Sequence, residues 1–196
     1  MNEHSLSSLV IVIDAGHGGY DPGARAGSVD EADLNLAVAK KLKKILEASK
    51  AEVRMIREED IDLADEDTTS RKRSDLKKRI EIINQEDVLL FISIHMNTNS
   101  HHATHGSEVY YQDNNEYSRQ LATLIQNRLK QVTNSKFPVK SGNYYLLNNS
   151  KKPGVIVECG FMTNDTDLNN LLQEKYQEDI AFGIYEGIKE FTKILQ

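Results

Sequence analysis

Residues 10–24, VIVIDAGHGGYDPGA, join a strand-like apolar run to a histidine placed among glycines. The continuous apolar run at 9–13 is typical of a strand that is buried on both faces of a parallel sheet. It ends abruptly in Asp14, Ala15, Gly16, His17, Gly18 and Gly19. Glycines permit sharp turns and let other groups approach the backbone closely. The stretch therefore predicts a buried strand followed by a tight turn that presents His17.

Strand and helix patterns alternate along the rest of the chain. Strand patterns occupy residues 9–13, 52–57, 88–94, 107–112, 144–147 and 155–158. Apolar residues at helical spacing occupy 31–48, 70–85, 116–132, 165–172 and 174–195. We expect Asp30 to cap the first helix. The alternation predicts an α/β fold, a three-layer sandwich in which helices flank a mostly parallel central sheet. Without repeats or linker-like stretches, we expect residues 1–196 to form a single domain.

Composition and charge narrow the class of function. The 196 residues are 39% hydrophobic and 28% charged, as in ordinary globular proteins. The formal net charge of -6 argues against a nucleic-acid partner, because a phosphate backbone favours a basic surface. No run of 18 apolar residues occurs, and the first nine residues do not resemble a signal peptide. Any export or anchor segment is therefore expected to be absent from this chain.

Four side chains suited to metal chemistry are expected at one edge of the predicted sheet. His17, His95 and Glu158 each lie at the end of a strand, and Glu31 opens the first helix. In open α/β sheets, ligands bind outside the carboxyl ends of the strands. Two histidines and a glutamate form a common catalytic zinc set, and a second glutamate can act as the base. The positions together favour a metal-dependent hydrolase, although a histidine after a strand or a glutamate at a helix start, taken alone, more often has a structural role.

The same residues lie in motifs that resemble the zinc-dependent N-acetylmuramoyl-L-alanine amidases of the amidase_3 family. VIDAGHGGYDPGA, EADLNLAVAKKL, LFISIHMN and VIVECGFMTN follow in that family's order, within roughly residues 9–192. Ala15 and Met96 replace the family's usual proline and alanine. The resemblance implies a single catalytic domain with one zinc ion per chain. It implies zinc ligands at His17, Glu31 and His95, and a catalytic glutamate at Glu158.

The resemblance also implies a substrate and a location. The family hydrolyses the amide bond between N-acetylmuramic acid and the L-alanine of peptidoglycan stem peptides. SRKRSDLKKR and VECGF look most like the sporulation branch, which acts on spore cortex peptidoglycan toward muramic-δ-lactam and is tied to germination. This implies an extracytoplasmic enzyme of the cell wall or spore envelope, and members often rely on a partner or activator protein. A vegetative or cell-division amidase and a non-catalytic peptidoglycan-binding module remain alternatives, and the oligomeric state is not predicted.

Other polar residues have both a structural and a functional explanation. Asn97 is a candidate for lining the substrate groove. Arg79 is a candidate for contacting substrate carboxylates, although we favour a structural pairing with an acid. Cys159 should face away from Glu158, because neighbours in a strand point to opposite faces, and this disfavours a cysteine hydrolase. Glu108 could point either into the site or to solvent.

Two further groups are expected to be solvated. The acidic run at 58–69 lacks the spacing of a calcium-binding loop and is expected to be a surface loop. Three histidines follow His95 in a polar segment and are expected to be loop residues rather than a second metal site; they are His101, His102 and His105.

Overall fold

A six-stranded sheet lies at the centre of the computed structural model, which describes residues 6–195. Its order is β4-β1-β5-β8-β6-β7. Four neighbouring strands are parallel: β4 (Glu52–Met55), β1 (Val10–Ala15), β5 (Val88–Asn97) and β8 (Gly154–Phe161). β6 (Glu108–Tyr111) runs antiparallel to β8, and β7 (Lys140–Ser141) runs parallel to β6. The mostly parallel sheet is thus confirmed, and a separate hairpin joins β2 (Arg25–Ala26) to β3 (Val29–Asp30).

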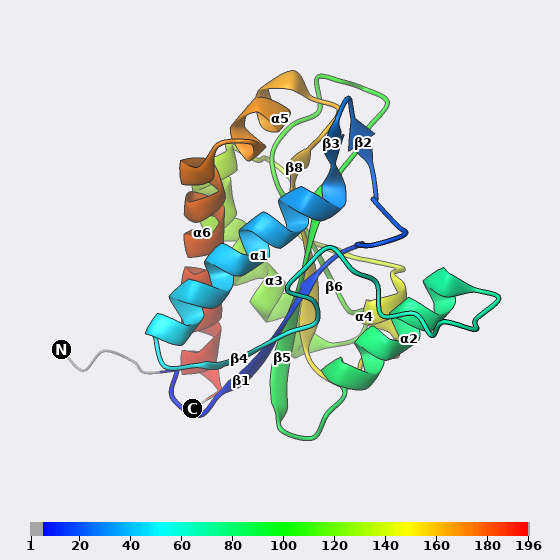
Figure 1. The fold of residues 1–196 in the computed structure, drawn as a ribbon. Coiled ribbons are helices and arrows are strands. Elements are labelled where there is room, and N and C mark those ends of the chain that lie inside the picture. The colour runs from blue at the N-terminus through cyan, green and yellow to red at the C-terminus, as the bar shows by residue number, and fades with distance from the viewer. Residues whose placement is uncertain (1–5, 196) are drawn as a thin grey trace.

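Helices cover both faces of this sheet. One face is covered by α1 (Glu31–Ala48), α3 (Glu116–Thr133) and α6 (Glu174–Ile194), and the other by α2 (Arg71–Ile83) and α4 (Tyr145–Asn149) (Figure 1). The short helix α5 (Asp165–Leu171) follows β8. This arrangement confirms the predicted α/β sandwich of three layers.

The two faces of the sheet differ in how far their apolar packing extends. On the α1 side, alternate residues of β1, β5 and β8 contribute to one large core from end to end. On the α2 side, a smaller core contains Val12, Phe91 and Ile156. Beyond it, toward the carboxyl ends of the same strands, the side chains become polar: Asp14, Ser93, His95 and Glu158. This polar half of the α2 face is the edge at which the sequence predicted a site.

The structure differs from the local expectations in three details. Residues 144–147 are not a strand, because Tyr145–Asn149 form the single-turn helix α4, which buries Leu146 and Leu147 against the smaller core. The strand β7 was not predicted, since its two residues are polar and exposed. Asp30 is the N-cap residue of α1, as predicted, but its side chain makes no cap hydrogen bond and instead accepts a 2.9 Å bond from Arg25 Nε.

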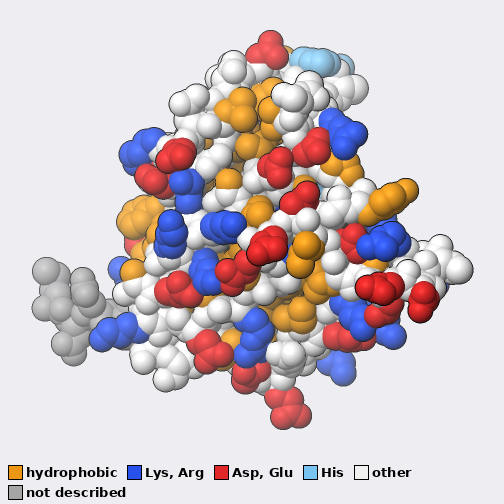
Figure 2. All heavy atoms as spheres, in the orientation of Figure 1, with side chains coloured by type: hydrophobic (Ala, Val, Ile, Leu, Met, Phe, Trp, Pro, Cys, Tyr) orange, Lys and Arg blue, Asp and Glu red, His pale blue; other side chains and the backbone are white. Residues whose placement is uncertain are grey.

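Charged side chains of both signs are mixed over the face seen in Figure 2. The acidic run at 58–69 forms a loop, as predicted, and its carboxylates pair with basic residues of α2. Arg71 lies 2.7 Å from Asp62, and Lys78 lies 3.2 Å from Asp65. Within residues 6–195, no helix has both the length and the apolar character needed to cross a membrane.

Candidate active site

The turn after β1 brings His17 against His95. β1 ends at Ala15, and the next residue, Gly16, passes so close to His95 that an added Cβ would lie 2.2 Å from ring atom Cε1. His17 itself has a left-handed backbone, with φ of 60°. The two imidazole rings then meet edge to face, with centroids 5.0 Å apart. Residue 16 must therefore be a glycine, because the ring of His95 packs directly against the backbone of the loop that carries His17.

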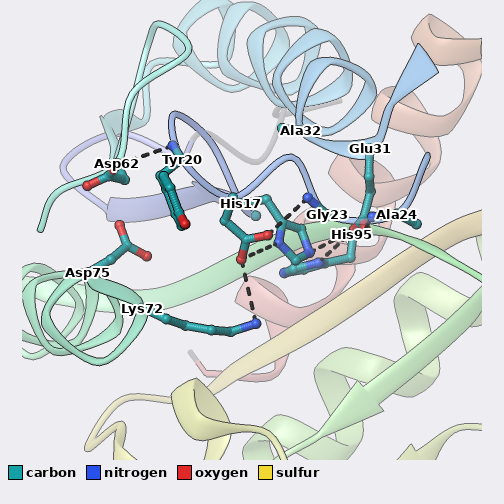
Figure 3. A network of polar contacts seen from close by, with 12 residues as sticks. His17, Tyr20, Gly23, Ala24, Glu31, Ala32, Asp62, Lys72, Asp75 and His95 are labelled. Carbon is teal, nitrogen blue, oxygen red and sulfur yellow. Dashed lines mark hydrogen bonds and ion pairs between the residues drawn. The ribbon is translucent and has the colours of Figure 1, made fainter. Parts of the chain in front are cut away.

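Glu31 lies between the two histidines. Its Oε1 is 3.3 Å from His17 Nε2 and 3.0 Å from His95 Nδ1 (Figure 3). One ligand atom from each of the three residues lies within 4.8 Å of the others. The structure therefore brings together the three side chains that the sequence predicted as metal ligands. Two imidazole nitrogens and a carboxylate are a donor set that suits a catalytic zinc ion.

Backbone and side-chain partners fix these groups. Glu31 Oε2 accepts a 2.9 Å hydrogen bond from the amide of Ala24, and Oε1 accepts one of 3.2 Å from the amide of Met96. His17 Nδ1 lies 3.0 Å from Asp21 Oδ2. A carboxylate on one ring nitrogen orients a histidine and leaves the other nitrogen for a metal. Asp21 therefore directs His17 Nε2 toward Glu31.

The electrostatics of the cluster favour a bound cation. Burial raises the pKa of Glu31, but hydrogen bonds from His17 and His95 outweigh this and hold the pKa far below its usual value. Burial lowers the pKa of His17, and its contacts with Glu31 and Asp21 raise it above the ordinary value. Glu31 is thus an anion with only 4% of its surface exposed. The raised pKa of His17 favours a proton there that partly balances this charge, and a metal ion could take its place.

Glu158 lies beside the cluster with a free oxygen. It pairs in register with His95 on the neighbouring strand, so the two side chains project from the same face of the sheet. It is 7% exposed, and its Oε2 has no hydrogen-bond partner among the described residues. Burial raises the pKa of Glu158 to about 7. A carboxylate in this state can both accept and return a proton near neutral pH.

A groove of about 460 Å³ opens over these residues. Its walls include His17, Glu31, His95, Asn97, Tyr144 and Glu158. A second hollow of about 480 Å³, lined in part by Tyr20 and Arg71, meets it at Asp21, Lys72 and Asp75. The candidate ligands and the candidate base therefore share one solvent-accessible groove that continues along α2.

Asn97 and Arg79 are both held by other residues of the chain. Asn97 lines the groove, and its Nδ2 donates a 2.8 Å hydrogen bond to Glu108 Oε2. Arg79 is 2% exposed and pairs with Asp14 at 2.5 Å and with Asp75 at 2.7 Å. Arg79 also donates to the carbonyl of His17. Its contacts therefore include two internal acids and the loop that carries a candidate ligand.

The remaining candidates lie apart from the cluster. Glu108 points into the protein, where it accepts hydrogen bonds from Lys140 and Tyr110 as well as Asn97. Cys159 is fully buried in the large core on the sheet face opposite Glu158. The histidines at 101, 102 and 105 are exposed.

Sequence reasoning missed three residues that support the site: Asp14, Asp21 and Arg57. Asp21 follows His17 by four residues, a spacing that could have suggested a partner for its ring. Asp14 is a buried acid directly after an apolar run, which could have suggested an internal cation. Arg57 carries no such signal, because its hydrogen bonds all go to backbone carbonyls, and the three that reach the loop and α1 are distant in the sequence.

Comparison with known proteins gives the family. A family model described as N-acetylmuramoyl-L-alanine amidase matches residues 11–190. The chain belongs to this amidase family. It therefore belongs to the enzymes that hydrolyse the amide bond between N-acetylmuramic acid and L-alanine in peptidoglycan.

Similar proteins include amidases of known structure. This amidase is 36% identical to the germination-specific N-acetylmuramoyl-L-alanine amidase of Bacillus subtilis, over 95% of this chain and 81% of the relative. The CwlD amidase from Clostridioides difficile, solved in complex with the GerS lipoprotein, superposes with a TM-score of 0.91 at 37% identity, covering 95% of this chain and 99% of the other. The catalytic domain of CwlV from Bacillus (Paenibacillus) polymyxa gives 0.83 at 30% identity, covering 95% and 99%.

Proposed function

We propose that this amidase is zinc-dependent, with one zinc ion held by His17, Glu31 and His95 and with Glu158 as the general base. The observation that carries the proposal is the pairing of two features in one groove. Three ligand atoms lie within 4.8 Å of one another. On the strand beside that of His95, Glu158 has a buried carboxylate oxygen with no hydrogen-bond partner among residues 6–195. The donor set suits zinc, and the unpartnered oxygen suits proton transfer.

A bound zinc ion would supply a Lewis acid for the substrate carbonyl and would activate water near neutral pH. Glu158 would take a proton from the attacking water. It would then deliver this proton to the L-alanine nitrogen as the amide bond breaks. Its raised pKa supports both transfers, because a base that is too acidic would not accept the proton. Asp21 would keep His17 in the tautomer that binds the metal.

We further propose that the substrate is spore cortex peptidoglycan, with muramic-δ-lactam formation as the later outcome. The likeness to the germination-specific enzyme and to CwlD supports this proposal. It implies action outside the cytoplasm, by residues 1–196 acting as one catalytic domain. A protein partner is part of the proposal, because CwlD was solved together with a lipoprotein. The vegetative alternative is supported by LytC of Bacillus subtilis, which is 33% identical and of which this chain spans 35%.

The decisive test compares the wild type with Glu158→Gln on purified peptidoglycan. Released stem peptides with a free L-alanine amine are quantified by mass spectrometry, and bound zinc is measured in the same samples. We expect the variant to keep its zinc and to lose about 10²- to 10⁴-fold in rate. Glu47→Gln, which alters a surface glutamate of α1 beside Lys43, serves as the matched control with full activity.

The outcomes separate the alternatives. Full activity of Glu158→Gln, or activity of the wild type after complete zinc removal, would overturn the proposed chemistry. A zinc-loaded wild type that binds peptidoglycan but releases no peptide, even with its partner present, would indicate a binding module. Equal rates on cortex and vegetative peptidoglycan would favour the vegetative alternative.

A further inference from the structure

Three consecutive backbone carbonyls lead into the candidate metal centre, and buried side chains hold all three. They belong to Ala15, Gly16 and His17. The guanidinium groups of Arg57 and Arg79, each only 2% exposed, together donate to all three carbonyls. The Nδ2 of the buried Asn35 also donates to Gly16 O at 3.1 Å. Buried carbonyls need partners, and most protein hydrogen bonds join backbone to backbone. Here side chains supply the partners of three successive residues.

Arg57 joins the two segments that carry candidate ligands. Its Nε donates to Ala15 O at 2.8 Å, and its Nη2 donates to Gly16 O at 2.9 Å. The same Nη2 donates to Ala32 O at 2.8 Å, and Nη1 donates to Glu59 O at 3.0 Å. Gly16 directly precedes His17, and Ala32 directly follows Glu31 (Figure 3 shows Ala32 beside Glu31). One nitrogen of Arg57 therefore bridges the residues adjacent to two candidate ligands.

Arg79 holds the carbonyls on either side of Gly16 in the same loop. Arg79 donates to Ala15 O at 3.0 Å and to His17 O at 2.8 Å. Gly18 packs against both Ile61 and Arg57, because a Cβ there would be 2.5 Å from Ile61 O and 2.8 Å from Arg57 Nε. Gly18 also has a φ of 121°, which a residue with a side chain rarely adopts. The backbone conformation and these two close contacts explain why a glycine follows the histidine.

We propose that Arg57 is a positioning residue for the metal centre, acting through the backbone to set His17 against Glu31. The inference rests on the proposed zinc site and extends it to a residue that does not line the groove. Its hydrogen bonds, among residues 6–195, go to carbonyl oxygens and not to carboxylates. Holding several carbonyls at once therefore depends on the planar, forked geometry of the guanidinium group. A lysine has the same charge but lacks this geometry.

The test measures zinc affinity and loop protection in two variants, Arg57→Met and Arg57→Lys. Zinc dissociation constants come from competition with a chromophoric chelator, on protein whose fold is checked by circular dichroism. We expect Arg57→Met to bind zinc about 10- to 100-fold more weakly. Arg57→Lys should also bind more weakly, by a smaller factor. Arg54→Met, which removes the ion pair between Arg54 of β4 and Asp87, should bind as the wild type does.

A readout without metal keeps the two proposals separate. Hydrogen exchange of metal-free Arg57→Lys should become faster in peptides covering residues 15–24 and remain unchanged in α6. Wild-type zinc affinity in Arg57→Lys would mean that charge alone suffices and would overturn the inference, even if Arg57→Met failed to fold. Unchanged exchange in the loop would overturn it too. A wild type that binds no zinc, together with faster loop exchange, would overturn the metal centre while leaving the backbone role of Arg57 intact.

Discussion

Glu108 and Glu158 lie directly opposite each other on antiparallel neighbouring strands, yet only Glu108 is fully partnered. Glu108 accepts hydrogen bonds from Lys140, Asn97 and Tyr110. Glu158 keeps one oxygen without a partner among the described residues. Both side chains are less than 10% exposed. The same sheet position on two strands thus holds one carboxylate that stabilises the fold and one that is left available for chemistry.

We expect Glu158→Gln to be at least as stable as the wild type in alkaline conditions, without metal. Burial raises the pKa of Glu158 to about 7, whereas an unfolded chain has a value of about 4.3. The unfolded chain therefore releases this proton first, and wild-type stability falls as pH rises from about 4.3 to about 7. The glutamine has no such loss. The stability of Glu158→Gln relative to the wild type should therefore be greater at pH 8 than at pH 4, by on the order of 4 kcal/mol at most.

Urea unfolding at the two pH values measures this difference. Glu108→Gln is the matched comparison and should lose about 1–3 kcal/mol at pH 8, because Lys140 loses its carboxylate. An equal loss in Glu158→Gln would show that Glu158 is stabilised by a partner after all.

Asp14→Asn should destabilise the protein by about 3 kcal/mol at pH 7, because it leaves the buried Arg79 with one acid fewer. Burial raises the pKa of Asp14, but Arg79 and Ser93 hold it below its usual value. Its contribution is therefore present above the unfolded pKa of about 3.9 and is lost as pH falls through the folded value. Urea unfolding should show the gap between wild type and variant closing in acid. A gap independent of pH would contradict the ion pair.

Asp21→Asn should weaken zinc binding by about tenfold, because it removes the carboxylate that orients His17. The same chelator competition measures the effect. Asp30→Asn, which removes only a bond to Arg25 near the start of α1, should leave the affinity unchanged. If both variants bind alike, Asp21 has no orienting role.

A thiol reagent should neither modify nor inhibit the native enzyme. Cys159 is fully buried, and burial raises the pKa of its thiol, so little reactive thiolate forms. Thiol titration before and after unfolding in urea should show the cysteine only in the unfolded protein. Rapid inactivation of the native enzyme by the reagent would revive the cysteine-hydrolase alternative.

The sequence predicted the buried strands and the candidate ligands for a common reason. Long apolar runs such as 88–94 have few alternatives to a buried strand, and polar residues at their carboxyl ends must then gather at one edge. The short run at 144–147 gave no such certainty, because Leu146 and Leu147 can be buried equally well from one helical turn. Four apolar residues do not distinguish the two structures.

The supporting residues were harder to predict for a different reason. Arg57 interacts with carbonyls 25 to 42 residues away, and every residue offers a carbonyl. No pattern of side chains marks such contacts in a sequence. The direct ligands were predictable from residue type, whereas the group that sets their backbone became visible only in three dimensions.

The α2 face of the sheet, apolar toward the amino ends of its strands and polar toward their carboxyl ends, has a consequence for mutational tolerance. In a saturation library scored once for abundance and once for amidase activity, the two scores should fall together at Val12, Phe91 and Ile156. At His95 and Glu158, a few residues further along, activity should be lost while abundance is retained. Substitutions that lower abundance would then give way to substitutions that lower only activity, and this change would occur at the same level along the neighbouring strands β5 and β8.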